Sequence, residues 1–118
     1  MTGNRADSLG GGLFGAASID IKDSVISVNT TFSFMVFGSG IYGGGDVVIT
    51  NSLISDNSGL DFGFGGGVYS YGDVTLFNTT VINNQVDTDG GGIYAAGTVV
   101  LNNSLVLGNR VVGGGVVD

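Results

Sequence analysis

The chain has 118 residues, including 24 glycines, and it contains no proline, cysteine, histidine or tryptophan. Its ten acidic residues are all aspartate and only three cations oppose them, so the formal net charge is −7. Nucleic acid is therefore not an expected partner, because it binds clustered cations. No apolar run is long enough for membrane insertion, and thiolate metal sites and Ser–His or Cys–His nucleophiles are excluded.

The apolar residues are mainly Val, Ile, Leu and Phe, which favour strands over helices. No window shows apolar residues at helical spacing, and glycines interrupt every stretch long enough to form a helix. An all-β fold is therefore expected.

Internal repeats begin near glycine triplets, the first of them at residues 10–12. The last glycine of each triplet is followed 17 residues later by an asparagine, at Asn29, Asn57, Asn84 and Asn109. The segments after these asparagines shrink from eight residues to three, so each repeat is a fixed frame with a variable insertion at one corner. The resulting units are residues 1–9, 10–37, 38–64, 65–89, 90–112 and 113–118.

Each frame holds three short apolar segments in chain order. In the second frame these are the segment beginning Ile41–Tyr42, the alternating segment Val47–Ile49, and the segment around Ile54, with polar corners between them. Alternation with a period of two makes each segment a strand with one buried face. A unit this short cannot fold alone but is the right size for one rung of a stack. Asparagine side chains at the last corner are expected to bond from rung to rung as a ladder.

The stretches "GGGIYAAGTVVLNNSLVLGN" and "GGGVYSYGDVTLFNTTVINN" resemble repeats of right-handed parallel β-helices of the polymorphic outer-membrane-protein and autotransporter-adhesin kind, within the pectate-lyase-like group. The predicted fold is a single-domain right-handed parallel β-helix of about four and a half rungs, with three strands per rung. The resemblance implies an extracellular or cell-surface location. It does not fix an activity, because such helices host enzymes, adhesins and passive stalks alike.

The tripeptide "GNR" occurs at residues 3–5 and again at 108–110, so the chain starts late in a rung, with Met1 in the column of Ile26. No capping segment is evident at either end, although native solenoids normally cover such edges. Either the chain is part of a longer solenoid or is modestly capped by its first residues, or copies stack head to tail into a filament. The residues of that end-stacking interface would be Met1, Gly3, Asn4, Arg5, Gly113, Gly114, Gly115, Val116, Val117 and Asp118.

Asp46 and Asp73 share a column on adjacent rungs, where stacked carboxylates offer a weak candidate for Ca²⁺ binding or for acid chemistry. The alternative is a pair of turn residues that bond nearby backbone. No basic residue lies in the columns beside them, so we expect neither catalytic residues nor a cofactor.

Aromatic residues form two groups. The residues that follow the first apolar position should form an outward ladder, either a self-supporting stack or a surface for sugars or a neighbouring chain. The insertions cluster phenylalanines at one corner, as a lateral contact or a local core. These ladder and corner residues are Phe14, Tyr42, Tyr69 and Tyr94, and Phe32, Phe34, Phe37, Phe62 and Phe64.

The sequence thus favours a structural or adhesive surface protein whose main partner is another copy of itself. The alternative is a β-helix that binds or degrades a surface polysaccharide through the aromatic ladder and the stacked aspartates.

Overall fold

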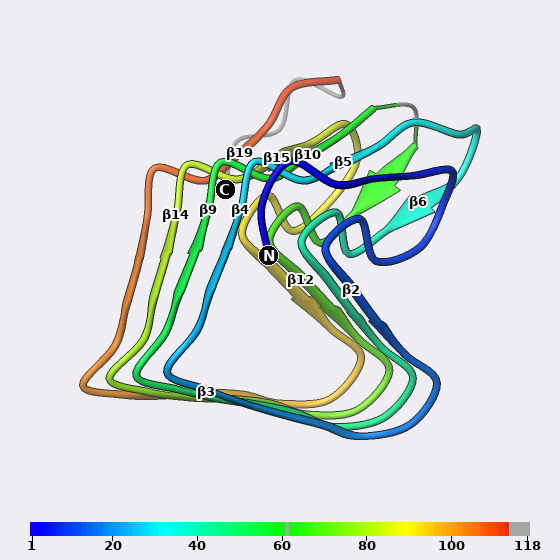
Figure 1. Ribbon diagram of the computed structural model, residues 1–118. Helices are drawn as coiled ribbons and strands as arrows, with labels where there is room; N and C mark the ends of the chain where they lie inside the picture. The colour runs from blue at the N-terminus through cyan, green and yellow to red at the C-terminus, as the bar shows by residue number, and fades with distance from the viewer. Residues whose placement is uncertain (61, 114–118) are drawn as a thin grey trace.

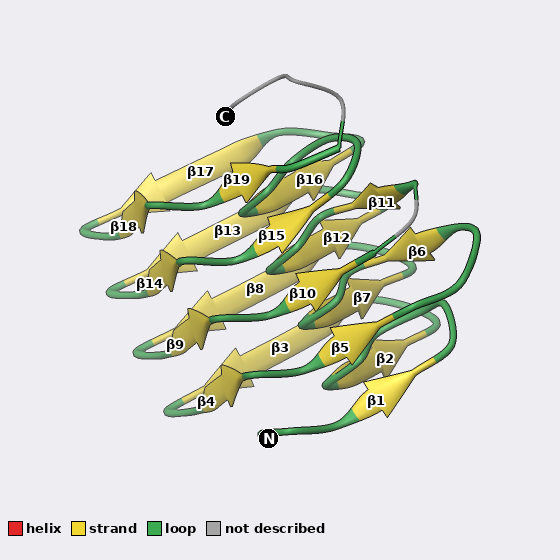
Figure 2. Cartoon of the chain, turned by 90° about the horizontal axis from the view of Figure 1, so that it is seen from above, coloured by secondary structure: helices red, strands yellow, loops and turns green. Residues whose placement is uncertain are grey.

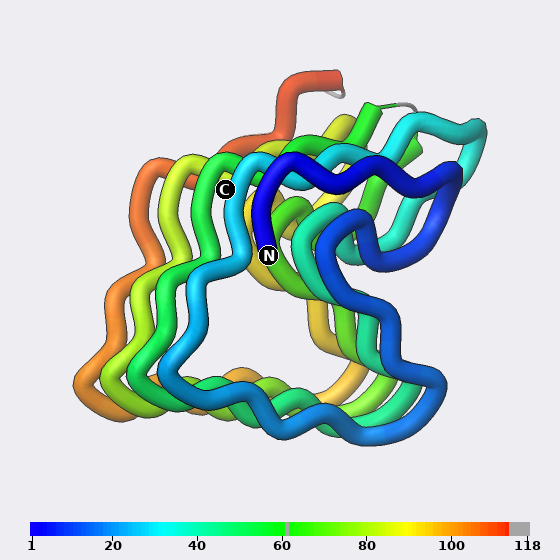
Figure 3. Tube along the Cα trace, in the orientation of Figure 1, coloured from blue at the N-terminus to red at the C-terminus, as the bar shows by residue number. Residues whose placement is uncertain are grey.

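The computed structural model describes residues 1–60 and 62–113, and its strands form a parallel β-solenoid of about four turns in one domain. Viewed along the stack, the rungs superimpose as a prism with three long walls, and loops project from one corner (Figures 1 and 3). Figure 2 shows the same strands from the side, stacked one above another in columns. The predicted parallel β-solenoid is confirmed.

Three four-stranded parallel sheets form the walls. The first wall consists of β2 (Leu13–Gly15), β7 (Ile41–Gly43), β12 (Val68–Ser70) and β16 (Ile93–Ala95). The second wall consists of β3 (Ile19–Lys22), β8 (Val47–Thr50), β13 (Val74–Phe77) and β17 (Val99–Asn102). The third wall consists of β4 (Val25–Ser27), β9 (Leu53–Ser55), β14 (Thr80–Ile82) and β18 (Leu105–Leu107).

Each rung also has short strands beyond the three that the repeat predicts. A five-stranded sheet follows the third wall and holds β1 (Arg5–Ala6), β5 (Thr30–Thr31), β10 (Ser58–Gly59), β15 (Gln85–Val86) and β19 (Arg110–Val111). The two longest insertions pair through β6 (Val36–Phe37) and β11 (Gly63–Phe64). These strands have only two residues each, too few to show an alternating pattern in the sequence.

The register follows the repeat columns. Arg5 pairs with Thr30, and Thr2 forms a bridge with Ser27, which places Met1 in the column of Ile26 as predicted. Residues 1–9 are therefore the last part of a rung below the first complete one. The same register continues to β19, where Arg110 pairs with Gln85.

The core lies inside the prism and consists of inward Val, Ile and Leu side chains from the three walls. In the middle rungs these residues, including Ile49, Ile54 and Leu76, are completely buried. Val36 and Val86 are also buried, beneath the insertion corner and outside the main cluster.

The corners use residues that accept a left-handed backbone. The corner between the second and third walls has positive φ at four stacked residues, which are Asp23, Asn51, Asn78 and Asn103. Asparagine and aspartate tolerate this region better than other residues with a side chain. Glycine is required at Gly65, which has a positive φ and where an added Cβ would clash with the carbonyl oxygen of Val68.

Candidate functional site

An asparagine ladder runs through the whole stack at the corner after the third wall. The backbone N–H and the Nδ2 of Asn29 both donate to Oδ1 of Asn57, at 3.0 and 2.9 Å. Asn57 also donates from Nδ2 to the carbonyl oxygen of Ile26, at 3.1 Å. The same two bonds between neighbours link all five members of the ladder, Asn4, Asn29, Asn57, Asn84 and Asn109.

The two ends of this ladder are complementary. At the N-terminal end, Asn4 donates twice to Asn29, but within the described part of the chain no donor reaches Oδ1 of Asn4. At the other end, Asn109 accepts from Asn84 and donates from Nδ2 to Val81. Its backbone N–H, which in every rung below donates to the next asparagine, has no acceptor among the described residues. One end therefore offers an acceptor and the other offers donors, in the geometry that joins neighbouring rungs.

The C-terminal end exposes residues that belong to the core. Val99, Leu101 and Val106 are 43%, 47% and 38% exposed, whereas their partners one rung below, Val74, Leu76 and Val81, are fully buried. These side chains line a hollow of about 720 Å³ at the C-terminal end of the stack. Its rim carries Tyr94 and Asn109.

The N-terminal end is better covered. Ile26 is fully buried and Ile21 is 6% exposed, although both lie in the first complete rung. Met1 lies over the third wall, where its ammonium group donates to the carbonyl oxygen of Val25 and its own carbonyl accepts from Ser27. The partial rung thus closes the third wall and leaves β2 and β3 as the open edges.

Those predicted end-stacking residues that the structure describes lie at the two ends of the stack, where β1 and β19 are the outermost strands of the short sheet (Figure 2). Met1, Gly3, Asn4 and Arg5 are on the N-terminal face, and Gly113 follows the last strand, β19. Gly114, Gly115, Val116, Val117 and Asp118 lie outside the described residues. The sequence prediction missed Val99, Leu101 and Val106, although their place in the last complete repeat was a signal that they lie at the end.

The aspartate column has a structural role in the observed geometry. Oδ1 of Asp46 accepts the backbone N–H of Asp73 at 2.9 Å, and Oδ1 of Asp73 accepts the N–H of Thr98 at 2.7 Å. Each carboxylate thus accepts a hydrogen bond from a backbone N–H at the equivalent corner of the next rung. No group of three or more metal-ligating side chains occurs in residues 1–60 and 62–113.

The aromatic ladder stacks ring on ring. The rings of Phe14, Tyr42, Tyr69 and Tyr94 follow one another at 5.1, 5.5 and 5.2 Å between centroids and are nearly parallel. The expectation of an outward, exposed ladder is wrong at Tyr69, which is 5% exposed. Phe37 and Tyr71 pack edge-on against it, at 4.9 and 5.3 Å.

This packing changes the chemistry of the phenols. Burial raises the pKa of Tyr69 well above its ordinary value, and its hydrogen bond with Tyr71 raises that pKa further. Burial also raises the pKa of Tyr42. Both groups therefore stay protonated where an exposed tyrosine would ionise.

The insertion corner separates into two parts. Phe37 and Phe64 are half-buried, stack on each other at 5.5 Å and pack on the ladder, so they form a local core. The other three rings remain exposed, those of Phe32, Phe34 and Phe62. The ring centroids of Phe34 and Phe62 are 5.1 Å apart, and the guanidinium of Arg5 lies 4.5 Å from the ring centroid of Phe32.

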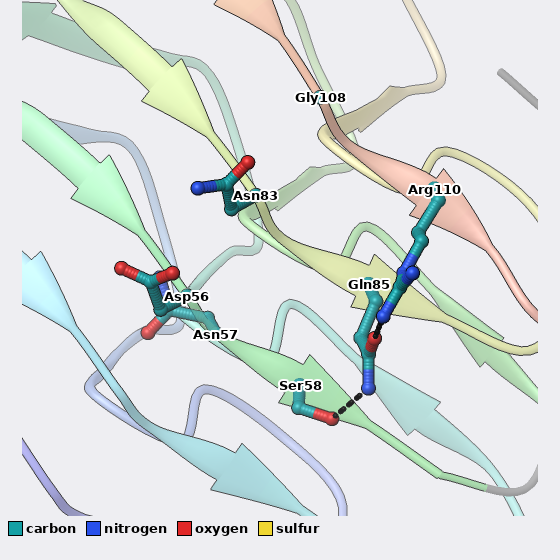
Figure 4. A pocket seen from close by; sticks show the side chains of 7 residues that line it. All are labelled: Asp56, Asn57, Ser58, Asn83, Gln85, Gly108 and Arg110. Atoms are coloured by element: carbon teal, nitrogen blue, oxygen red, sulfur yellow. Dashed lines mark hydrogen bonds between the residues drawn. The ribbon is translucent and has the colours of Figure 1, made fainter.

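A shallow polar groove lies on the outer surface beside the asparagine ladder (Figure 4). On one side, Gln85 donates to the hydroxyl of Ser58 at 3.1 Å and accepts from Arg110 at 3.0 and 3.2 Å. Asp56 and Asn83 lie on the other side. The groove can exchange hydrogen bonds with a polar molecule, but its described lining contains no aromatic ring on which a sugar could stack.

Comparison with protein-family models, with curated proteins and with solved structures finds no match to this chain. Within the described ranges no helix has the length and apolarity needed to cross a bilayer.

Proposed function

We propose that the chain is a structural protein without catalytic activity, which extends by head-to-tail stacking of copies into a filament. The observation that supports this most strongly is the exposure of Val99, Leu101 and Val106, whose equivalents in the rung below are fully buried. A cell-surface location and an adhesive role rest on the repeat resemblance alone.

The joint follows from the register of the repeat. Asn4 of one copy stacks on Asn109 of the preceding copy, and Asn109 donates to Oδ1 of Asn4 in the same way as Asn84 donates to Oδ1 of Asn109 within the chain. Met1 then covers the exposed Val106, and β1 pairs with β19 as a sixth strand of the short sheet. A non-closing contact of this kind generates an open filament.

The joint also contains one unfavourable pair. Its register places Arg5 of one copy directly over Arg110 of the other, because both belong to the column of Thr30, Ser58 and Gln85. Like charges opposite each other in a sheet are destabilising, and salt screens exposed pairs. Filament formation should therefore increase with ionic strength, and Arg5→Ser should remove most of that dependence.

The polysaccharide alternative has less support. It needs an accessible ring surface and free carboxylates, but Tyr69 is buried and Oδ1 of Asp46 and of Asp73 each accept a backbone N–H.

The experiment compares the full chain with two variants by sedimentation velocity and negative-stain electron microscopy. Val106→Asp places a charge in the joint, and Phe34→Asp places the same charge in the exposed insertion corner. We expect filaments from the wild type and from Phe34→Asp and only monomers from Val106→Asp, with circular dichroism showing that all three are folded. Filaments from Val106→Asp, or monomers from the wild type at every concentration, contradict the proposal.

A further inference from the structure

The second wall of the last rung presents an open strand edge. All four residues of β17 are exposed, whereas the inward residues of β13, Val74 and Leu76, are fully buried. Val74 donates its backbone N–H to the carbonyl oxygen of Thr98 at 2.9 Å. Val99 occupies the same position one rung later, and its N–H has no acceptor among the described residues. Within residues 1–60 and 62–113 the edge therefore has neither apolar cover nor hydrogen-bond partners on its outer side.

The proposed joint does not close this edge. Within one copy, Met1 and Thr2 form the level next to β4 in the third wall. In the joint, the same two residues form the level next to β18 of the preceding copy. Because β3 precedes β4 in the same rung and β17 precedes β18, the joint leaves between β17 and β3 one level that no described strand of either copy fills. Strands in a sheet are about 4.8 Å apart, so the two edges face each other across about 10 Å. That space holds one extended strand.

The four existing levels of the wall define the occupant. Their first and third residues point inward and are always Val, Ile or Leu, and their second and fourth residues vary. A strand at the empty level therefore needs branched apolar residues at alternate positions. The net charge of −7 favours an occupant without acidic residues.

We infer that this level is a docking site for a parallel β-strand from a partner polypeptide, with Val, Ile or Leu at two alternate positions and neutral or basic residues elsewhere. Main-chain hydrogen bonds to β17 provide the affinity, and the two inward side chains, placed over Val99 and Leu101, provide the specificity. The size of the space rests on the proposed joint, whereas the chemistry of the edge rests on β17 alone.

The test uses a fluorescent peptide with the sequence of residues 98–104, which is neutral and reproduces the wall pattern. Its matched control has Val99→Ser and Leu101→Ser. Fluorescence anisotropy with the full chain should show saturable binding of one labelled peptide per chain, and binding of the control should be weaker by about tenfold or more, since two apolar side chains are lost. Equal binding of the two peptides, or no binding, overturns the inference.

Variants of the full chain localise the binding. Leu101→Asp should weaken peptide binding about tenfold or more, since it puts a charge in the site, and Phe34→Asp should leave binding unchanged. The two peptides keep the test decisive if Leu101→Asp fails to fold. If filaments form but bind no peptide, the strand site is wrong and the joint stands. If the chain stays monomeric but binds the peptide saturably, the strand site is supported and the joint is wrong.

Discussion

The first and last rungs of the solenoid place similar apolar residues in the same columns but bury them to different extents. Ile21 and Ile26 in the first rung are 6% and 0% exposed, and Leu101 and Val106 in the last rung are 47% and 38% exposed. In the third wall the difference between Ile26 and Val106 matches the partial rung at residues 1–9, which lies against β4 at the N-terminal end.

This difference shows that a rung does not complete its own core. Each inward side chain is covered from above and below by the equivalent residues of the neighbouring rungs, so its burial is a property of the stack. Substitutions of the same kind should therefore cost much more stability in a middle rung than at an end.

The largest contrast is expected along the asparagine ladder. Asn84→Ala removes the acceptor of two bonds from Asn57 and the donor to Ile54, and leaves buried polar groups unpaired. Such groups cost about 1–3 kcal/mol each, so the loss should reach about 4 kcal/mol. Asn4→Ala removes one side-chain bond at the end and should cost about 1 kcal/mol. Urea unfolding monitored by circular dichroism measures both; similar losses would mean that the ladder does not stabilise the interior.

The next contrast concerns leucines in one column. Leu76→Ala creates a cavity in a fully packed interior and should cost about 3 kcal/mol, whereas the exposed Leu101→Ala should cost less than about 1 kcal/mol. The comparison requires dilute protein, because assembly would bury Leu101. A large loss for Leu101→Ala in a monomeric sample would show that the last rung is already covered.

Glycines give a smaller contrast. Both Gly65 and Gly3 have positive φ, but an added Cβ at Gly65 meets the backbone of Val68, and one at Gly3 meets nothing within 4 Å. Gly65→Ala should therefore cost about 2 kcal/mol or more, and Gly3→Ala only the backbone strain of about 1 kcal/mol. Thermal unfolding of the two variants provides the measurement, and equal shifts in Tm would contradict the close approach at Gly65.

The smallest effect is expected from alkaline pH. Because the pKa of Tyr69 is raised by folding, its contribution to stability is present below about pH 10 and is lost as the pH rises further. Above pH 10 the unfolded chain releases a phenolic proton that the folded chain keeps, so the free energy of unfolding falls. Unfolding between pH 8 and pH 11.5 should show this decline, and Tyr69→Phe should make it shallower. If the free energy of unfolding of Tyr69→Phe falls with pH as steeply as that of the wild type, Tyr69 is not the cause of the decline.

Much of the fold could be predicted because repetition makes each residue class visible several times. The fixed spacing from Gly12 to Asn29 recurs in every frame and sets the register, and the second "GNR" at residues 108–110 placed Met1 correctly. The column position of Asp46 and Asp73 was also evident, but the direction in which their carboxylates bond was not.

Other features depend on packing between segments that do not repeat. The insertions differ in length and composition, so their sequences do not show that Phe37 packs on Tyr69 while Phe34 stays exposed. The ends could not be judged from residue type either, since Leu76 and Leu101 are the same residue in the same column. They differ in their place in the sheet, because β13 lies between β8 and β17 and β17 is the outermost of the four strands.

The most direct test of the head-to-tail joint is disulfide trapping. The chain has no cysteine, and Arg5 and Arg110 are both exposed and should stack in the joint. Stacked residues of neighbouring parallel strands lie about 4.8 Å apart, a distance that a disulfide spans. Under mild oxidation, the variant carrying Arg5→Cys and Arg110→Cys should form a ladder of covalent oligomers on a denaturing gel, and either single variant should stop at dimers. A control variant carries Lys22→Cys and Arg110→Cys, two positions that the joint does not bring together. The joint is contradicted if the Arg5→Cys and Arg110→Cys variant stops at dimers, or if the control variant forms an equal ladder of oligomers.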